Sequence, residues 1–281
     1  MVKIIADTTS CLPLELVKQA GIYYVPQIIV IGEETYRDDT EMNALEFLKR
    51  QRTSPVLPKT AAPGPAFYTP IYREIQEQGN SGVVLAPSAQ VSGTLRGASV
   101  AAQDFPDLDI HVVDTELIAG GLGALVLEAN RWAQAGLDAP TIVDRAKAMA
   151  KRHRVYFLVD TLDYLYKGGR IGAASHLVGS LLQMKPILTL KEGHVASLES
   201  QRTHKRALAR LKEIVVSECP AGPESFLCVM HGDALEQAQA LAQDLSSQLN
   251  IPVEQIPIYD LTPAILVHSG PGVLAVAFFV Q

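Results

Sequence analysis

A cluster of hydroxyl side chains directly follows an apolar run in this sequence. The segment APSAQVSGTLRGAS leaves the run Val83–Leu85 and enters a helical pattern at Leu95. Because the N–H groups at a helix start carry partial positive charge, this turn is a candidate anion site. Ser92 would donate a hydroxyl hydrogen bond, and Gly93 would allow close backbone approach. The alternative is an ordinary helix cap, for which serine and threonine are common residues.

Three further segments carry polar side chains in predicted loops. LPKTAAPGP offers one hydroxyl, Thr60, in a segment that its prolines make rigid. LDYLYKGGRI ends a short helix at two glycines, and Arg170 follows with a guanidinium suited to carboxylate or phosphate. HSGPG begins with His268, which can hydrogen-bond to an acidic ligand or exchange a proton with it. Their structural alternatives are a surface linker, an exposed arginine and a histidine in a turn.

Several chemistries lack their usual signatures. The sequence has no GxxxxGK[ST] phosphate loop, no GxSxG elbow and no HExxH pair, so P-loop, serine-hydrolase and zinc-protease classes are disfavoured. Residues 120–123 (GGLG) are only a fragment of the GxGxxG fingerprint, and close packing of a helix on a sheet is the favoured interpretation. The cysteines Cys11, Cys219 and Cys228 form no CxxC pair, so we expect neither a disulfide framework nor a metal site.

Composition indicates a globular protein with a substantial core. The 281 residues are 48% hydrophobic and 19% charged, and two domains are the favoured number. The net charge of −6 disfavours nucleic-acid binding, which relies on basic groups. The longest purely apolar run covers only residues 273–280, whereas a membrane-spanning helix needs roughly 20 residues. Asp7 comes too early for a signal peptide, so we expect a cytoplasmic location.

The order of elements predicts two domains, residues 1–150 and 151–281. In the first, apolar strands at 2–6, 83–86 and 111–113 are each followed by turn residues and a helix, which is typical of a parallel βαβ sheet. A β-hairpin with its turn at Gly32-Glu33 is predicted within 22–37. A helix capped by Thr141 precedes the boundary. In the second domain hairpins also join strands, which favours an α+β arrangement.

Taken in order, IIADTTSCLP, PKTAAP, VSGTLRGA, LDYLYKGGRI, MKPIL and HSGPG resemble segments of the DegV family of bacterial fatty-acid-binding proteins. The resemblance covers essentially the whole chain. It implies a two-domain α/β protein with a long-chain fatty acid in an apolar tunnel between the domains. It also implies a protein without catalysis or cofactor of its own. Such a protein presents the fatty acid to a separate ATP-using fatty acid kinase, and the acyl phosphate supplies phospholipid synthesis.

The resemblance also implies roles for individual residues. Thr60 and Ser92 match the hydroxyls that hold the head group. Arg170 matches the arginine of the GGRI segment near the head group, and His268 matches a histidine in the same polar network. Arg202 matches an arginine associated with kinase-dependent function rather than with holding the acid.

One of the matching loops departs from the family pattern. The family usually reads TSQP, whereas this chain reads TAAP from Thr60 to Pro63, so a hydroxyl and an amide side chain are missing. Losing a hydrogen bond to a charged group costs about 1.5–3 kcal/mol when nothing replaces it. The backbone N–H of Ala61 is the candidate replacement, and the departure bears on head-group affinity and ligand identity.

Two other functions are compatible with the same residues. One is a hydrolase or transferase for a small anionic ester that uses Ser92 with His268, although no third group to orient the histidine is evident. The other is a regulatory module that binds a nucleotide or sugar phosphate. The basic clusters 151–154 and 202–206 are predicted to be solvated. The second is also a candidate surface for docking the kinase or an anionic membrane.

Overall fold

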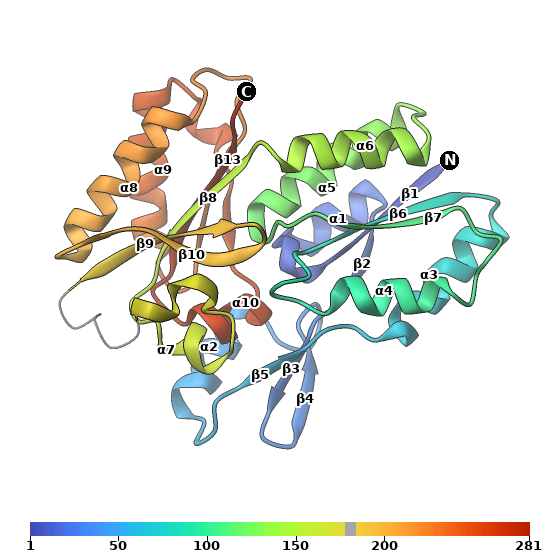
Figure 1. The fold of residues 1–281 in the computed structure, drawn as a ribbon, viewed down its shortest axis with the longest axis horizontal. Helices are drawn as coiled ribbons and strands as arrows, with labels where there is room; N and C mark the ends of the chain where they lie inside the picture. Colours follow the sequence, from blue (N-terminus) through green and yellow to red (C-terminus); the bar gives the residue numbers. More distant parts are fainter. Residues whose placement is uncertain (178–183) are drawn as a thin grey trace. The chain divides into compact units, whose positions relative to one another are not determined.

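The computed structural model describes residues 1–177 and 184–281 (Figure 1). The chain forms two compact units, of which unit 1 contains residues 1–43 and 54–151 and unit 2 contains residues 44–53 and 152–281. The sequence-based division assigned residues 44–53 to the first domain. They form helix α2 (Ala44–Thr53), which groups with unit 2 because it buries Phe47 and Leu48 and packs against the later helix α10 (Pro263–Ser269).

Unit 1 is built on a parallel sheet covered by helices on both faces, as the alternating pattern predicts. Helices α3 and α4 lie on one side of the sheet, and α5 and α6 lie on the other (Figure 1). The four strands, in the order β2-β1-β6-β7, are β1 (Val2–Asp7), β2 (Tyr23–Val25), β6 (Ser81–Ala86) and β7 (Ile110–Asp114). The helical segments are η1 (Thr8–Ser10), α1 (Leu14–Ala20), α3 (Pro65–Glu77), α4 (Thr94–Ala102), α5 (Ala119–Gln134) and α6 (Ala139–Ala150).

The strand order of this sheet changes direction beside β1. The chain proceeds from β1 to β2 on one side, whereas β6 and then β7 lie on the other side. Ligands of open α/β sheets bind outside the carboxyl ends of the strands at such a switch point. The segments concerned here are the residues after Asp7, which ends β1, and after Ala86, which ends β6.

The predicted hairpin is shorter than expected. β3 (Ile28–Ile31) and β4 (Glu34–Arg37) pair antiparallel around Gly32-Glu33, as predicted. The prediction was wrong for residues 22–27, because β2 follows α1 and pairs in parallel with β1 instead. β5 (Lys59–Ala61) pairs with the other edge of β3, which sets Thr60 opposite Ile29 in a three-stranded sheet.

The predicted cap of α6 is one turn too late. The side chain of Asp138 accepts a hydrogen bond of 2.9 Å from the N–H of Thr141, so Asp138 is the cap and Thr141 is the residue it serves. The correction follows from proline chemistry, because Pro140 has no N–H and suits the first turn of a helix.

Unit 2 contains a six-stranded mixed sheet in the order β10-β9-β8-β13-β11-β12, which matches the predicted α+β arrangement. Its strands are β8 (His153–Leu158), β9 (Lys185–Lys191), β10 (His194–Gln201), β11 (Leu227–His231), β12 (Ile258–Asp260) and β13 (Leu274–Phe279). Its remaining helical segments are α7 (Asp163–Lys167), η2 (Gly172–Leu177), α8 (His204–Glu218), α9 (Leu235–Leu249) and η3 (Val253–Gln255). The predicted β9–β10 hairpin turns at Glu192-Gly193, both at positive φ.

The core of unit 2 lies between its sheet and the helices α8 and α9 (Figure 1).

We expect Leu245→Ala, at a fully buried position of α9, to lower the free energy of unfolding by about 2–5 kcal/mol. Leu235→Ala is the matched control on the same helix, because Leu235 is 51% exposed, and it should change stability by less than about 1 kcal/mol. Urea denaturation followed by circular dichroism measures both, and equal effects would contradict this packing.

Candidate functional site

A buried carboxyl group, Asp7, ends β1 at the switch point. Its Oδ1 accepts hydrogen bonds from the N–H of Thr9, at 3.0 Å, and from the Thr9 hydroxyl. Its Oδ2 accepts hydrogen bonds of 2.6 Å from Gln27 Nε2 and from the hydroxyl of Thr94. Burial raises the pKa of Asp7, and the hydrogen bonds it accepts oppose that shift. The carboxyl therefore joins the end of β1, the β2–β3 connection and the first residue of α4.

Ser92 lies at the end of the same network. Its Oγ is 3.0 Å from Thr94 Oγ1 and accepts the N–H of Thr94 at 3.3 Å. Gln27 Nε2 also donates to Thr94 Oγ1, at 2.8 Å. Ser92 is half-buried and Gly93 is exposed, directly before α4. The Ser92 hydroxyl thus accepts a hydrogen bond from the backbone two residues later. It also ends a chain of hydrogen-bonded side chains that begins at Asp7.

The loop after β5 packs against the start of α4. A Cβ on Gly93 would lie 3.3 Å from the Cβ of Ala62, and a Cβ on Gly97 would overlap the carbonyl oxygen of Pro63. The absence of side chains at both glycines allows this approach. The two unit 1 segments predicted to hold the head group, residues 60–63 and 92–94, therefore lie side by side.

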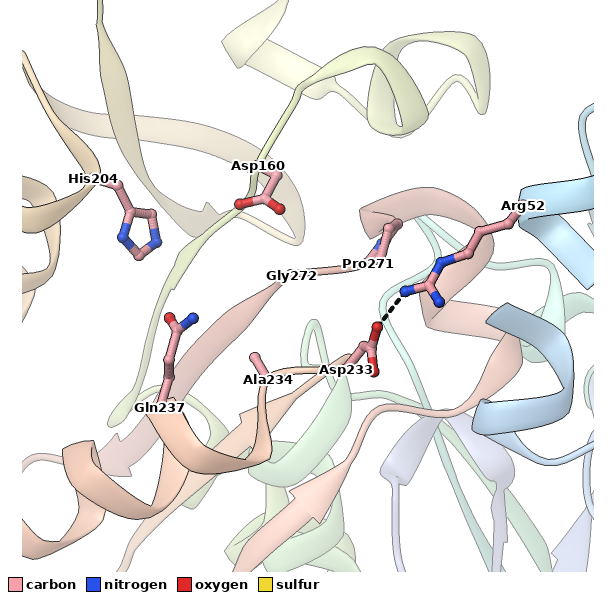
Figure 2. A pocket seen from close by; sticks show the side chains of 8 residues that line it. All are labelled: Arg52, Asp160, His204, Asp233, Ala234, Gln237, Pro271 and Gly272. Carbon is pink, nitrogen blue, oxygen red and sulfur yellow. Dashed lines mark hydrogen bonds and ion pairs between the residues drawn. The ribbon is translucent and has the colours of Figure 1, made fainter. Parts of the chain in front are cut away.

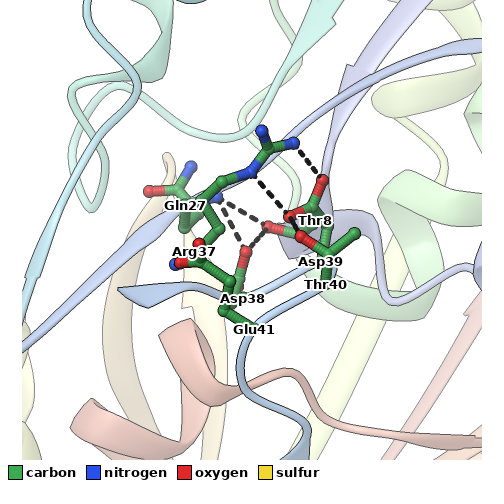
Figure 3. Close-up of polar contacts among 7 residues, drawn as sticks. All are labelled: Thr8, Gln27, Arg37, Asp38, Asp39, Thr40 and Glu41. Carbon is green, nitrogen blue, oxygen red and sulfur yellow. Dashed lines mark hydrogen bonds and ion pairs between the residues drawn. The ribbon is translucent and has the colours of Figure 1, made fainter. Parts of the chain in front are cut away.

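A second buried carboxyl, Asp38, lies near Asp7. Figure 3 shows its Oδ1 accepting from the hydroxyl of Thr8, at 2.7 Å, and from the N–H of Gln27, at 2.8 Å. Burial raises the pKa of Asp38 to about 7. The neighbouring Asp39 instead pairs with Arg37, at 2.6 Å. Two acidic groups with poorly solvated charges thus flank Gln27, Asp38 at its backbone and Asp7 at its side chain.

In unit 2 the segments that contain Arg170 and His268 meet. A Cβ on Gly168 would overlap Nδ1 of His268, and a Cβ on Gly270 would overlap the ring of Tyr164. Arg170 follows the helix α7 and donates from its guanidinium to the carbonyl of Gly168 at 2.8 Å. The glycines of GGRI and HSGPG are therefore required for the close approach of α7 and α10.

His268 is electrostatically tuned to stay neutral. Burial, followed by the positive charge of Arg170, lowers the pKa of His268 to about 4. The ring therefore serves as a neutral hydrogen-bonding group over the physiological pH range, and Arg170 carries the positive charge of the pair.

Within unit 2, Arg202 is not part of the arrangement of Arg170 and His268. It is exposed at the end of β10, and Thr203, which follows it, caps α8 by accepting the N–H of Arg206 at 3.2 Å. The other basic cluster is partly structural, because Arg154 lies 3.8 Å from Glu218 and the ring of His153 stacks at 5.5 Å from that of Phe279. The 202–206 segment therefore matches the predicted solvated face.

A cavity in unit 2 was not indicated by the sequence. Its volume is about 370 Å³, and an ion pair between Arg52 and Asp233 forms part of its wall (Figure 2). Asp160, His204 and Gln237 line it from other elements. Because these side chains are polar or charged, the cavity does not suit an acyl chain.

Residues 1–177 and 184–281 contain neither a metal-binding cluster nor a membrane-spanning helix. No group of three or more histidine, cysteine, aspartate or glutamate side chains there is arranged to hold a metal ion. No helix in the same ranges combines the length and the apolar character needed to cross a bilayer.

Comparison with known proteins decides the family. All 281 residues match the model of the DegV family. The chain belongs to the DegV family. A DegV domain-containing protein of Streptomyces coelicolor is 38% identical over 98% of this chain and 97% of its own length. The resemblance predicted from the short motifs is therefore confirmed.

Solved structures extend this agreement to the fold. A DegV family protein from Thermus thermophilus, described as fatty acid binding, matches with a TM-score of 0.90 and 31% identity, covering 100% of this chain and 99% of that one. DegV of Bacillus subtilis, described as a fatty acid binding protein, matches with a TM-score of 0.88 and 27% identity over 100% and 99% of the two chains. The predicted α/β class with a second, mixed-sheet domain is confirmed.

Sequence reasoning missed the residues that support Ser92. Asp7 was noted only as part of a motif, and Gln27 was not singled out. A usable signal existed for Asp7, since it ends an apolar parallel strand, where polar side chains gather at the edge of the sheet. Gln27 had no such signal, because its role depends on a contact with Thr94, 67 positions away.

The tuning of His268 gives a measurable titration. We expect its pKa near 4 in the folded protein, so stability linked to this group falls as the pH drops from about 6.5 toward 4, where the unfolded chain binds the proton and the folded chain does not. Arg170→Gln should raise the pKa, because it removes a positive charge that disfavours imidazolium. NMR titration of the histidine ring measures this, with Arg206→Gln as the control. An unchanged pKa in Arg170→Gln would contradict the assigned coupling.

Proposed function

We propose that this DegV family member binds a long-chain fatty acid, with the carboxylate held at Thr60, Ala61, Ser92 and Gly93 of unit 1. The observation that carries the proposal is the hydroxyl of Ser92 at the start of α4, connected through Thr94 to a buried carboxyl at the switch point of a parallel sheet. The fatty-acid-binding descriptions of similar solved structures support the ligand class.

The local chemistry of unit 1 suits a carboxylate. The first N–H groups of α4 have no partner within the helix and carry partial positive charge. The loop of residues 60–63 lies against that helix start and adds the Thr60 hydroxyl. The N–H of Ala61 is the proposed substitute for the polar side chains that the TAAP loop lacks.

Arg170 and His268 are the proposed ligand residues of unit 2. Arg170 supplies a permanent positive charge and a planar set of donors that fit a carboxylate. His268 stays neutral because its pKa is near 4, so it supplies a hydrogen bond without a second charge. An acyl chain removed from water would add about 0.8 kcal/mol per methylene to the binding.

We further propose that the bound acid is presented to a separate fatty acid kinase, which forms the acyl phosphate used for phospholipid synthesis. The sequence has no P-loop signature, which supports assigning the phosphoryl transfer to another protein. Exposed Arg202 and the basic segment after it are the proposed contact for that kinase. The same basic segment is suited to a transient contact with an anionic membrane surface.

The ester hydrolase alternative has weaker support. A histidine with a pKa near 4 is a poor general base at neutral pH, and the side-chain hydrogen-bond partner of Ser92 in unit 1 is Thr94. No catalytic residue is therefore assigned. The phosphometabolite alternative is tested by the identity of the bound molecule.

Mass spectrometry of the ligand extracted from protein purified without detergent tests the binding class. We expect a stoichiometric long-chain fatty acid, and a phosphorylated metabolite would contradict the proposal.

Ser92→Ala should weaken fatty acid binding by about 1.5–3 kcal/mol, a loss of roughly tenfold to hundredfold in affinity. Ser99→Ala, at an exposed position of α4, is the matched control and should bind fatty acid with normal affinity. Unchanged affinity in Ser92→Ala would remove Ser92 from the site.

Kinase presentation is tested at Arg202. We expect Arg202→Gln to reduce acyl phosphate formation by an ATP-using fatty acid kinase by about tenfold, with a weaker salt dependence, because an exposed charge acts on association. Fatty acid affinity should not change. Lys191→Gln, an exposed cation in the β9–β10 hairpin, is the control. A normal rate for Arg202→Gln at low salt would argue against this contact.

A further inference from the structure

The polar groups beneath Ser92 form one chain with a definite direction. Ser92 Oγ lies 3.0 Å from Thr94 Oγ1, which lies 2.6 Å from Oδ2 of Asp7. Gln27 Nε2 donates to both Thr94 Oγ1 and Asp7 Oδ2, at 2.8 and 2.6 Å. Asp7 is only 1% exposed, and in the described part of unit 1 no cation forms an ion pair with it.

The protons available to this chain fix what Ser92 can offer a ligand. Four donor hydrogen bonds reach the carboxyl of Asp7, which suits an ionised group. Thr94 has a single hydroxyl proton and gives it to Asp7. Ser92 must then donate its own proton to Thr94, because Thr94 has only lone pairs left. Because Ser92 Oγ also accepts the N–H of Thr94, in this state it presents only its remaining lone pair to a ligand, and this repels a carboxylate.

A proton on Asp7 reverses the two hydroxyl bonds of the chain, Thr94 to Asp7 and Ser92 to Thr94. Protonated Asp7 donates to Thr94 Oγ1, which still accepts Gln27 Nε2 with its second lone pair. The Thr94 hydroxyl then donates to Ser92 Oγ. The hydroxyl proton of Ser92 is released from the chain and can be donated to a carboxylate.

We propose that fatty acid binding is coupled to the uptake of one proton, which Asp7 holds and Thr94 transmits, so that Ser92 becomes a donor to the bound carboxylate. The inference rests on the proposed contact between Ser92 and the carboxylate. Asp7 is a positioning residue here, since it acts on the ligand through two hydroxyl groups. The bound carboxylate and Asp7 are then not both charged around one short hydroxyl chain.

Other titratable groups face Asp7 and set the controls. Asp38, after β4, has a pKa raised to about 7 by burial and interacts with the charge of Asp7. Tyr24 of β2 and Tyr68 of α3 have pKa values raised above the usual value by burial, so both stay neutral at the pH of the experiment. Cys11 follows η1 and is buried. Burial raises the pKa of Asp7 as well, in the direction that favours proton uptake.

Isothermal titration calorimetry with decanoate, in pairs of buffers with different ionisation enthalpies, counts the protons taken up. At a pH above the pKa of free Asp7, where the acid is also ionised, we expect uptake of about one proton per decanoate. The apparent affinity should fall by about tenfold per pH unit above the pKa of free Asp7. Binding without proton uptake would overturn the inference. This experiment uses only the wild-type protein, so it does not depend on whether a variant folds.

Two matched variants separate Asp7 from its neighbour. Asp7→Asn should bind without proton uptake and independently of pH, because the amide cannot take up the acid proton. A merely structural role of Asp7 would lower the affinity of this variant but would leave the proton uptake and the pH dependence of binding in place. Asp38→Asn should retain the uptake, since Asp38 accepts hydrogen bonds from Thr8 and the N–H of Gln27, and in the described part of unit 1 these do not continue to Thr94 or Ser92. Uptake that persists in Asp7→Asn or vanishes in Asp38→Asn would overturn the inference. Absence of binding at every pH by both decanoate and oleate would instead contradict the proposed function.

Discussion

The start of α4 depends on one buried carboxyl group. Asp7 loses its contact with water, and a buried charge without hydrogen-bond donors would cost several kcal/mol. Its donors come from Thr9, Gln27 and Thr94, which belong to three separate elements of unit 1. Because each donor is needed to offset the desolvation, the carboxyl fixes the β2–β3 connection and the first turn of α4 relative to β1. The position of Ser92 depends on these hydrogen bonds, because Ser92 lies directly before the first turn of α4 and contacts Thr94.

In unit 2 the polar side chains are positioned by close packing of the backbone rather than by a buried carboxyl group. Gly168 and Gly270 lack the Cβ atoms that would overlap His268 and Tyr164, so two short helices approach closely. Burial and the charge of Arg170 then keep His268 neutral. One unit thus organises its polar groups around a buried acid, and the other places an arginine beside a neutral histidine. Both arrangements leave groups that suit a carboxylate.

The errors of sequence reasoning have physical explanations. Apolar residues at 22–31 fit one long hairpin strand, but the chain after α1 gains more by pairing Tyr23–Val25 with β1. Asp138 and Thr141 are both good caps by residue type, and the position of Pro140 decided between them. Residues 44–53 fell in the predicted first domain by their position in the chain, whereas α2 buries Phe47 and Leu48 and groups with unit 2.

The family, the parallel βαβ character of unit 1 and the hydroxyl-bearing turn before α4 could all be predicted from the amino-acid sequence. These features depend on local patterns, such as apolar runs, turn residues and short motifs, whose residues are close together in the sequence. The hydrogen-bonded chain of Asp7, Gln27, Thr94 and Ser92 could be found only in the folded protein, because residues 7 and 94 are 87 positions apart. The tertiary structure also decided that His268 is neutral, since its pKa depends on burial and on Arg170, to which no local pattern connects it.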